Sequence, residues 1–230
     1  MSEELAVTTA QGPGRWVLDR PEGDVSALLL LGHGAGGGIE ARDLAGLARW
    51  LPPHGVAVAR FEQPWRTAGR KVAVAPPRLD EAWLESVDVV RTVVADVPLV
   101  VGGRSAGARV ACRTAGALGA AAVLCLSFPL HPPGRTTSRL PELLAPDVPR
   151  VVLQGSRDTF GGADELRAAL GEVAASGPPS LSGDVVEVRE VPDAGHDLRP
   201  AARAGIDGPT WRGLVEAAAL SAVLAAVGAR

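Results

Sequence analysis

The sequence predicts an α/β protein, a single domain built on a doubly wound, mostly parallel sheet with helices on both faces. Three observations predict this class. Short continuous apolar runs, such as residues 26–34, are typical of strands that are buried on both faces. Longer segments with apolar residues at helical spacing alternate with these runs. The length of 230 residues fits one such domain with a sizeable core.

The parallel strands are expected where apolar runs end at glycine or at a polar turn. In chain order these runs cover residues 26–34, 55–61, 97–103, 121–128, 150–155 and 184–191. The last run mixes apolar and charged positions, which indicates a half-exposed strand near the sheet edge. The pattern of residues 4–24 is weaker, and "RWVLDRP" within it predicts one or two antiparallel edge strands.

The helices are expected between these runs. They cover residues 40–51, 78–97, 105–115, 163–174 and 209–227. In the second helix Leu79, Trp83 and Val87 fall on one face, as a helix packed on a sheet requires. The Pro-rich stretch 128–150 joins two strands of the same sheet. We expect it to be a short loop in place of a full cap domain, within a single domain 1–230 whose core begins near residue 24.

The composition excludes several classes of partner. The net charge is −3 and no basic block is present, which argues against nucleic acid. The 16-residue apolar segment 214–229 is shorter than the roughly 20 residues that span a bilayer, and it contains Glu216. The N-terminus lacks the apolar region of a secretory signal. We therefore expect a soluble, cytoplasmic protein, a monomer or homodimer, that acts on a small molecule and contacts no membrane.

Two further features of the composition concern origin and cofactors. Of the 23 basic residues only Lys71 is a lysine, which indicates a GC-rich and bacterial genome. Cys112 and Cys125 lie in apolar segments and are expected to be buried, reduced thiols. Two cysteines without histidines at ligand spacing do not make a zinc site, so neither a metal nor an organic cofactor is expected.

The stretch "LVVGGRSAGARVA", residues 99–111, contains a candidate nucleophile. Ser105 has Gly103 two positions before it and Gly107 two positions after it, the G-x-S-x-G pattern. A predicted strand leads into Ser105 and a predicted helix follows it, as in a nucleophile elbow, where a sharp turn exposes the serine hydroxyl above the sheet. The alternative is that Ser105 only caps the following helix.

Candidates for the acid and the base follow in the order that such a sheet requires. Asp158 comes just past the strand 150–155, and His196 comes shortly past the strand 184–191. Neighbouring parallel strands bring their carboxyl ends to one edge, which would place both residues beside Ser105. Individually, Asp158 fits an ordinary turn residue and His196 an exposed loop residue. Asp193 and Asp197 are weaker candidates for the acid, because a residue adjacent to the histidine normally points elsewhere.

An oxyanion hole needs backbone N–H groups directed at developing negative charge. We expect one from Ala106, which follows the nucleophile, and one from Ala35 or Gly34 in the loop "GHGAGGG". His33 in this loop is expected to hold it by hydrogen bonding, rather than to act as the base. The loop lacks the Lys-Ser/Thr of a phosphate-binding loop, which argues against nucleotide binding.

Six stretches in order along residues 26–198 resemble one family: "LLLGHGAGGG", "ARFEQPWR", "VVGGRSAGARVA", "LCLSFPLHPPG", "VVLQGSRDTFG" and "DAGHDL". The chain is similar to α/β-hydrolases, and more narrowly to the small dienelactone-hydrolase-like group that includes a subunit of the non-specific-lethal chromatin complex and its testis-expressed relative. The resemblance implies the α/β-hydrolase fold and a triad at Ser105, Asp158 and His196. Ala106 and Ala108 depart from the methionine or glycine expected in the family, which affects pocket shape.

These residues predict a serine hydrolase that cleaves a small or apolar carboxylic ester, thioester or lactone through an acyl-enzyme on Ser105. Because only the stretch 128–150 could cover the site, we expect a shallow pocket with aromatic and aliphatic walls. Its expected lining residues are Trp65, Phe128, Leu130, His131 and Phe160. Arg66 or Arg104 could receive a substrate carboxylate. The alternative function is a non-catalytic binding or scaffold protein that keeps the fold. Peptide hydrolysis is disfavoured, because no gating domain is present.

Overall fold

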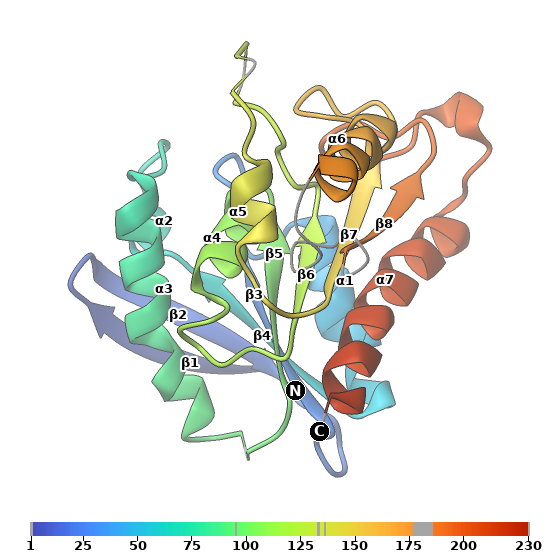
Figure 1. Ribbon diagram of the computed structural model, residues 1–230. Coiled ribbons are helices and arrows are strands. Elements are labelled where there is room, and N and C mark those ends of the chain that lie inside the picture. The colour runs from blue at the N-terminus through green and yellow to red at the C-terminus, as the bar shows by residue number, and fades with distance from the viewer. Residues whose placement is uncertain (1, 95, 133, 136, 177–185, 230) are drawn as a thin grey trace.

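The computed structural model describes residues 2–94, 96–132, 134–135, 137–176 and 186–229, and a sheet of eight strands lies at its centre (Figure 1). The strands are β1 (Ser2–Thr9), β2 (Gly12–Asp19), β3 (Ala27–Gly32), β4 (Val56–Glu62), β5 (Leu99–Arg104), β6 (Ala122–Leu126), β7 (Arg150–Gly155) and β8 (Val186–Val191). Their spatial order is β1-β2-β4-β3-β5-β6-β7-β8. Strands β3 to β8 are parallel, and β1 and β2 pair antiparallel. The predicted α/β class with a mostly parallel sheet is therefore confirmed.

The chain winds in two directions from the middle of the sheet. It passes from β3 outward to β4, returns across β3 to β5, and then continues through β6, β7 and β8 on the other side. The loops that follow β3 and β5 therefore diverge at the carboxyl edge. A crevice forms at such a point in a doubly wound sheet, and ligands bind there.

Helices cover both faces of the sheet, as a parallel sheet requires. They are α1 (Arg42–Trp50), α2 (Pro64–Thr67), α3 (Pro76–Arg91), α4 (Ala106–Thr114), α5 (Leu140–Leu144), α6 (Ala163–Ser176) and α7 (Gly208–Gly228). Helices α3, α4 and α6 share one apolar cluster with Leu28 and Leu30 of β3. Helices α1 and α7 share the opposite cluster with Leu29 and Leu31. Alternate residues of β3 thus point to opposite layers.

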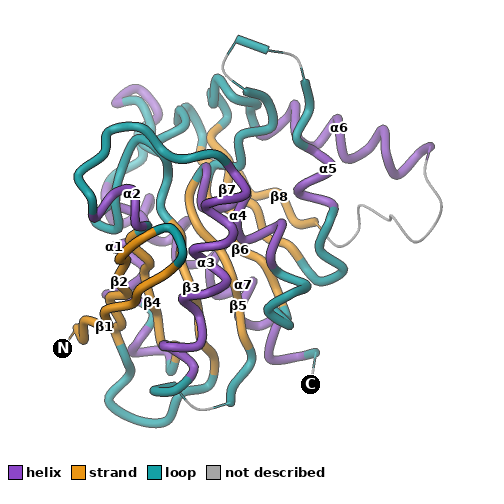
Figure 2. The backbone as a smooth tube through the Cα atoms, turned by 90° about the vertical axis from the view of Figure 1, so that its left-hand side faces the viewer, coloured by secondary structure: helices purple, strands orange, loops and turns teal. Residues whose placement is uncertain are grey.

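The N-terminal residues form a hairpin at one end of the sheet, far from α6 and β8 at the other end (Figure 2). Strand β1 is the edge strand, whereas β2, which holds most of "RWVLDRP", pairs with both β1 and β4. Trp16 of β2 is fully buried, and its ring centre lies 4.8 Å from that of Phe61 and 5.2 Å from that of Trp83. The apolar core therefore begins well before residue 24, where the sequence pattern placed its start.

Strand β8 lies at the other sheet edge and alternates between partly buried and exposed positions, in agreement with its mixed pattern. Residues 184–185 of its expected range lie outside the described residues. The second predicted helix ends earlier than expected, because α3 stops at Arg91 and a turn follows it.

The stretch 128–150 is not only a loop. Its described part contains the one-turn helix α5, where Leu140 and Leu143 are buried in the core. Glu142 of α5 accepts hydrogen bonds from Arg109 and Arg113 of α4. The described residues of this stretch hold no further helix, so no cap domain covers the carboxyl edge of the sheet, as expected.

Helix α7 extends one residue beyond the predicted helix 209–227 at each end, and it begins before the apolar run 214–229. It has 21 residues, and among the described helices it is the one long and apolar enough, by length and composition alone, to cross a membrane. Trp211, Val215 and Ala219 on one of its faces are buried against the sheet. Packing in the core therefore explains the apolar residues on this face of the helix.

Candidate active site

Ser105 lies in a sharp turn between β5 and α4. Its backbone has φ 52° and ψ −108°, a region that side chains with a Cβ rarely adopt. Close packing holds the turn in place. A Cβ added to Gly107 would lie 2.2 Å from the carbonyl oxygen of Gly32, so α4 and β3 meet backbone against backbone. The strained turn and this close contact place Ser105 at the carboxyl edge of the sheet.

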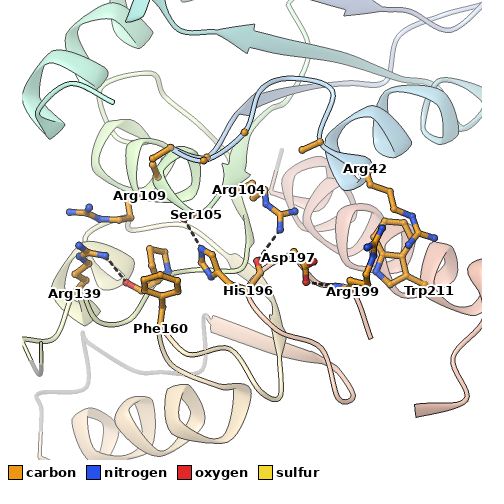
Figure 3. A pocket seen from close by; sticks show the side chains of 17 residues that line it. Arg42, Arg104, Ser105, Arg109, Arg139, Phe160, His196, Asp197, Arg199 and Trp211 are labelled. Carbon is orange, nitrogen blue, oxygen red and sulfur yellow. Dashed lines mark hydrogen bonds between the residues drawn. The ribbon is translucent and has the colours of Figure 1, made fainter. Parts of the chain in front are cut away.

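His196 lies between Ser105 and Asp158. Its Nε2 is 2.8 Å from Ser105 Oγ (Figure 3), and its Nδ1 is 2.8 Å from Asp158 Oδ2. A carboxylate only accepts hydrogen bonds, so the proton of a neutral imidazole lies on Nδ1 and Nε2 accepts from the serine hydroxyl. The structure thus brings the three residues singled out from the sequence into one hydrogen-bonded chain, from loops after β5, β7 and β8.

The Asp158 side chain is completely buried, and its oxygens are held from several directions. Oδ1 accepts from the amide of Phe160 at 2.9 Å, and Oδ2 accepts from Nε2 of Gln154 at 3.0 Å in addition to the imidazole. A buried carboxylate with these partners has a fixed position. The phenyl ring of Phe160 packs on the other side of His196, with ring centres 4.4 Å apart.

The other two aspartates near the histidine do not contact its ring. Asp193 is paired with Arg157 at 2.5 Å, and Asp197 accepts a hydrogen bond from the amide of Arg199 at 3.0 Å. Asp193 is therefore paired with the loop after β7, and Asp197 with a backbone amide of its own loop.

Arg104 connects the loop of His196 to α1. Its Nη1 lies 2.5 Å from Oδ2 of the fully buried Asp43, and its Nη2 donates to the His196 carbonyl at 2.9 Å. Burial raises the pKa of the Asp43 carboxyl, and the charge of Arg104 opposes that rise. Arg104 was considered as a receptor for a substrate carboxylate, but these contacts already use its charge. Its role here is to position the backbone of His196.

We expect Arg104→Met to lower the free energy of unfolding by about 3 kcal/mol, because Asp43 would remain buried without its partner. Urea denaturation followed by tryptophan fluorescence measures this. In the double variant Asp43→Asn/Arg104→Met the loss is expected to be smaller than in Arg104→Met, since no buried charge remains. An Arg104→Met protein as stable as the wild type would contradict the assigned pairing.

The loop after β3 runs alongside the serine. A Cβ added to Gly34 would lie 3.5 Å from Ser105 Cβ, and both Gly34 and Ala35 line the same cavity as Ser105. Ala106 is the first residue of α4, and the first N–H groups of a helix have no partner within the helix. The residues considered as oxyanion donors therefore line the same cavity as Ser105.

His33 holds this loop, as its sequence position suggested. Its Nδ1 lies 2.9 Å from the Gly34 carbonyl, and its Nε2 accepts from the amide of Gln63 at 3.2 Å. Burial lowers the pKa of the His33 imidazole, which favours this neutral form. Trp65 packs against the ring, with centres 5.5 Å apart.

Ser105 and His196 open into a cavity of about 740 Å³ whose walls include glycines and arginines together with the aromatic rings of Phe160 and Trp211. Of the five residues expected to line it, Phe160 does so. Trp65 is 4% exposed and packs on His33, and Phe128 and Leu130 are buried in the core. His131 is bonded to Glu165 at 2.8 Å, away from the cavity. The expectation is therefore wrong for four of the five residues, while Phe160 and Trp211 still give the cavity aromatic walls.

The cavity lining includes five arginines, of which sequence reasoning considered one. They are Arg42, Arg104, Arg109, Arg139 and Arg199. Arg66, the other arginine considered, does not line this cavity. A local signal existed for Arg109, because it lies one helical turn after Ser105 on the same helix. Arg139 lies 34 positions beyond Ser105, in the Pro-rich stretch, where side-chain directions follow no period.

Cys112 and Cys125 are buried and free, with their sulfur atoms 3.5 Å apart. Within the described ranges, no group of three or more His, Cys, Asp or Glu side chains could hold a metal ion.

Comparison with known proteins gives three results. Residues 25–223 match the model of a family described as "Alpha/beta hydrolase domain". A Xanthomonas campestris structure described as a serine hydrolase without a lid is similar, with 21% identity over 96% of this chain and 94% of that chain, and a TM-score of 0.68. A serine hydrolase homologue from Coxiella burnetii has 16% identity over 95% and 96%, with a TM-score of 0.73. At these identities the structures show a common fold. No curated protein sequence matches this chain.

Proposed function

Because the chain belongs to the alpha/beta hydrolase domain family, we propose that it is a serine hydrolase that cleaves a carboxylic ester, thioester or lactone through an acyl-enzyme on Ser105. The observation that supports this most directly is the hydrogen-bonded chain from Ser105 through His196 to Asp158. In such a chain the imidazole acts as a base toward the serine, and the buried carboxylate orients the imidazole.

In the first half of the proposed reaction, Ser105 Oγ attacks the acyl carbonyl while its proton passes to Nε2 of His196. Asp158 stabilises the imidazolium that forms. His196 then gives this proton to the leaving group as the bond between the acyl carbon and that group breaks. In the second half, a water molecule attacks the acyl-enzyme, and His196 takes its proton and returns it to Oγ. One water is consumed for each bond cleaved.

The negative charge on the carbonyl oxygen needs backbone donors during both steps. We propose the amide of Ala106 and that of Ala35 or Gly34 for this role. Support comes from the position of Ala106 at the start of α4 and from the loop that passes beside Ser105. The strained backbone of Ser105 also fits this role, because strain of this kind collects at functional turns.

The six sequence stretches described above also support the narrower grouping with small dienelactone-hydrolase-like proteins. The arginines of the cavity give no support to a purely apolar acyl group, since they would have to lose water against it. A small ester with polar substituents fits these walls better.

A fluorophosphonate probe tests the proposal, because it reacts with a serine that is activated as a nucleophile. We expect it to modify the purified protein at Ser105, as located by peptide mass spectrometry. We also expect hydrolysis of 4-nitrophenyl butyrate, measured by the release of nitrophenol. Both signals should disappear in Ser105→Ala, and Ser26→Ala provides the matched control, because Ser26 is exposed and bonded to the Gly55 carbonyl, outside the cavity.

Circular dichroism of each sample establishes that it is folded. A folded wild-type protein that neither reacts with the probe nor hydrolyses the ester would overturn the hydrolase proposal. The retained fold would then favour the binding or scaffold alternative.

A further inference from the structure

One end of the cavity holds more positive than negative charge. Here α4 supplies the guanidinium groups of Arg109 and Arg113, and Arg139 lies just before α5. Helices α3 and α5 supply two carboxylates, Asp80 and Glu142. The five groups together leave a net charge of about +1 at neutral pH.

The pairing within this cluster locates the excess charge. Arg109 makes two hydrogen bonds to Glu142, at 2.9 and 2.6 Å. Arg113 makes two to Asp80, both at 2.7 Å, and a third to Glu142 at 2.6 Å. Both carboxylates are therefore occupied, and Arg139 has no carboxylate partner among the described residues. The excess charge lies on Arg139.

Arg139 is half-buried and lines the cavity. Its Nη1 makes two long hydrogen bonds, at 3.4 Å each, to the carbonyls of Pro129 and His131. Its Nε and Nη2 form the other edge of the guanidinium, and no described residue bonds to them. Burial lowers the pKa of Arg139, and the neighbouring charge of Arg109 lowers it further. The negative charge of a bound anion would act against both effects and raise the pKa of Arg139.

The remaining arginines of the cavity either have a carboxylate partner or are exposed to solvent. Arg104 is paired with Asp43. Arg42 is exposed and lies over the ring of Trp211, with its guanidinium carbon 3.9 Å from the ring centre, and Arg199 is also exposed. Water solvates exposed guanidinium groups well, so these two need no further partner. The cluster around Arg139 is therefore the best candidate for an anion site.

Arg139 lies at one end of the cavity. Phe160 lies between this end and the end that holds Arg42 and Arg199. In Figure 3, Arg109 and Arg139 lie together, and Phe160 lies between them and His196. An extended molecule with one end at Ser105 would pass the phenyl ring before its other end reached Arg139. A short apolar chain suits this path, since it can contact the ring.

We propose that the substrate is an ester or thioester that carries a carboxylate at some distance from the scissile bond, and that Arg139 binds this carboxylate. This inference rests on the hydrolase function proposed above. The free edge of Arg139 can hold a carboxylate through two parallel N–H···O bonds. The net charge of about +1 is balanced by one carboxylate, whereas a phosphate monoester would leave excess negative charge. With the carboxylate on the acyl side, hydrolysis consumes one water and releases a dicarboxylate, a proton and an alcohol, or a thiol where the substrate is a thioester.

Two esters with the same adipoyl chain and the same leaving group test this proposal. In 4-nitrophenyl hydrogen adipate the far end is a carboxylate, and in methyl 4-nitrophenyl adipate it is a neutral methyl ester. We expect the wild-type protein to prefer the anionic ester in kcat/KM by at least about tenfold, as a charged hydrogen-bonded pair provides. Arg139→Gln should reduce this preference by about 10-fold to 100-fold, and Arg139→Lys should retain part of it. The control is Arg135→Gln, which removes the same charge from the same stretch at an exposed position that does not line the cavity.

A binding measurement on Ser105→Ala separates this proposal from the hydrolase function. Calorimetry with monomethyl adipate should show binding that weakens at least tenfold when Arg139→Gln is added. Binding of this kind by a protein that hydrolyses neither ester would leave the carboxylate site standing and remove the proposed reaction. Equal kcat/KM for the two esters, unchanged by Arg139→Gln, would overturn the carboxylate site and leave the hydrolase function intact. No binding and no hydrolysis would overturn both.

Discussion

Replacement of His196 by alanine is expected to lower kcat for 4-nitrophenyl butyrate by about 10⁵-fold to 10⁶-fold, while the protein remains folded. Among the described residues, His196 Nε2 is the one ring nitrogen bonded to Ser105 Oγ, and no second base among them is in place to take the proton. The loop that carries His196 is held by Arg104 and by backbone contacts, which the substitution leaves intact. Stopped assays with high enzyme concentration, over hours, measure the residual rate.

The double variant Ser105→Ala/His196→Ala gives the sharper test. Residues that act as one unit lose their contribution together, so the double variant should be no slower than either single variant. His54→Ala serves as the control, because His54 is exposed and bonded to Glu216 at 3.0 Å, outside the cavity. Its kcat should stay within about twofold of the wild type. Losses that multiply in the double variant would mean that His196 and Ser105 act independently.

The second large effect is expected for stability. Gly107→Ala should lower the free energy of unfolding by more than about 4 kcal/mol, because the new methyl would lie 2.2 Å from the Gly32 oxygen and 2.4 Å from the Gly32 carbonyl carbon. Both are backbone atoms of a central strand, so neither can move without displacing β3 or α4. Urea denaturation followed by circular dichroism measures the loss.

Gly213→Ala is the matched control for this substitution. Gly213 lies within α7, and an added Cβ would meet nothing within 4 Å. This change should therefore raise stability slightly, by about 0.5–1 kcal/mol, since alanine favours a helix over glycine. Gly103→Ala meets the same Gly32 oxygen, at 2.4 Å, and should behave like Gly107→Ala. A Gly107→Ala protein within 1 kcal/mol of the wild type would show that α4 and β3 are not in close contact.

The parallel part of the fold could be predicted because burial on both faces leaves a clear pattern. Strand β3 has six consecutive buried residues, and its run of leucines has no other simple explanation. The hairpin was harder, because β1 is an edge strand whose exposed residues include Glu3 and Glu4. The helix α5 could not be predicted, since five residues are too few to show a period.

The positions of Ser105, Asp158 and His196 could be inferred because topology decides where strand ends lie. The walls of the cavity could not, because they depend on the direction of each side chain in irregular segments. Phe128 and Leu130 follow β6 directly and turn into the core, while Arg139 turns toward the cavity. The pair of Arg104 and Asp43 joins residues 61 positions apart, and no local pattern reveals such a contact.

The short stretch between β6 and β7, with α5 as its one described helix, affects which acceptor could take the acyl group from Ser105. Enzymes with a lid must open it in each cycle, often on a microsecond to millisecond scale, and they can exclude water while it is closed. In the part of the chain that the structure describes, no cap domain covers the carboxyl edge of the sheet, so we expect bulk water, at about 55 M, to have access to Ser105 throughout the proposed cycle. At that concentration water outcompetes a dilute alcohol or amine for the acyl group. We therefore expect this open architecture to favour hydrolysis over acyl transfer in the proposed reaction.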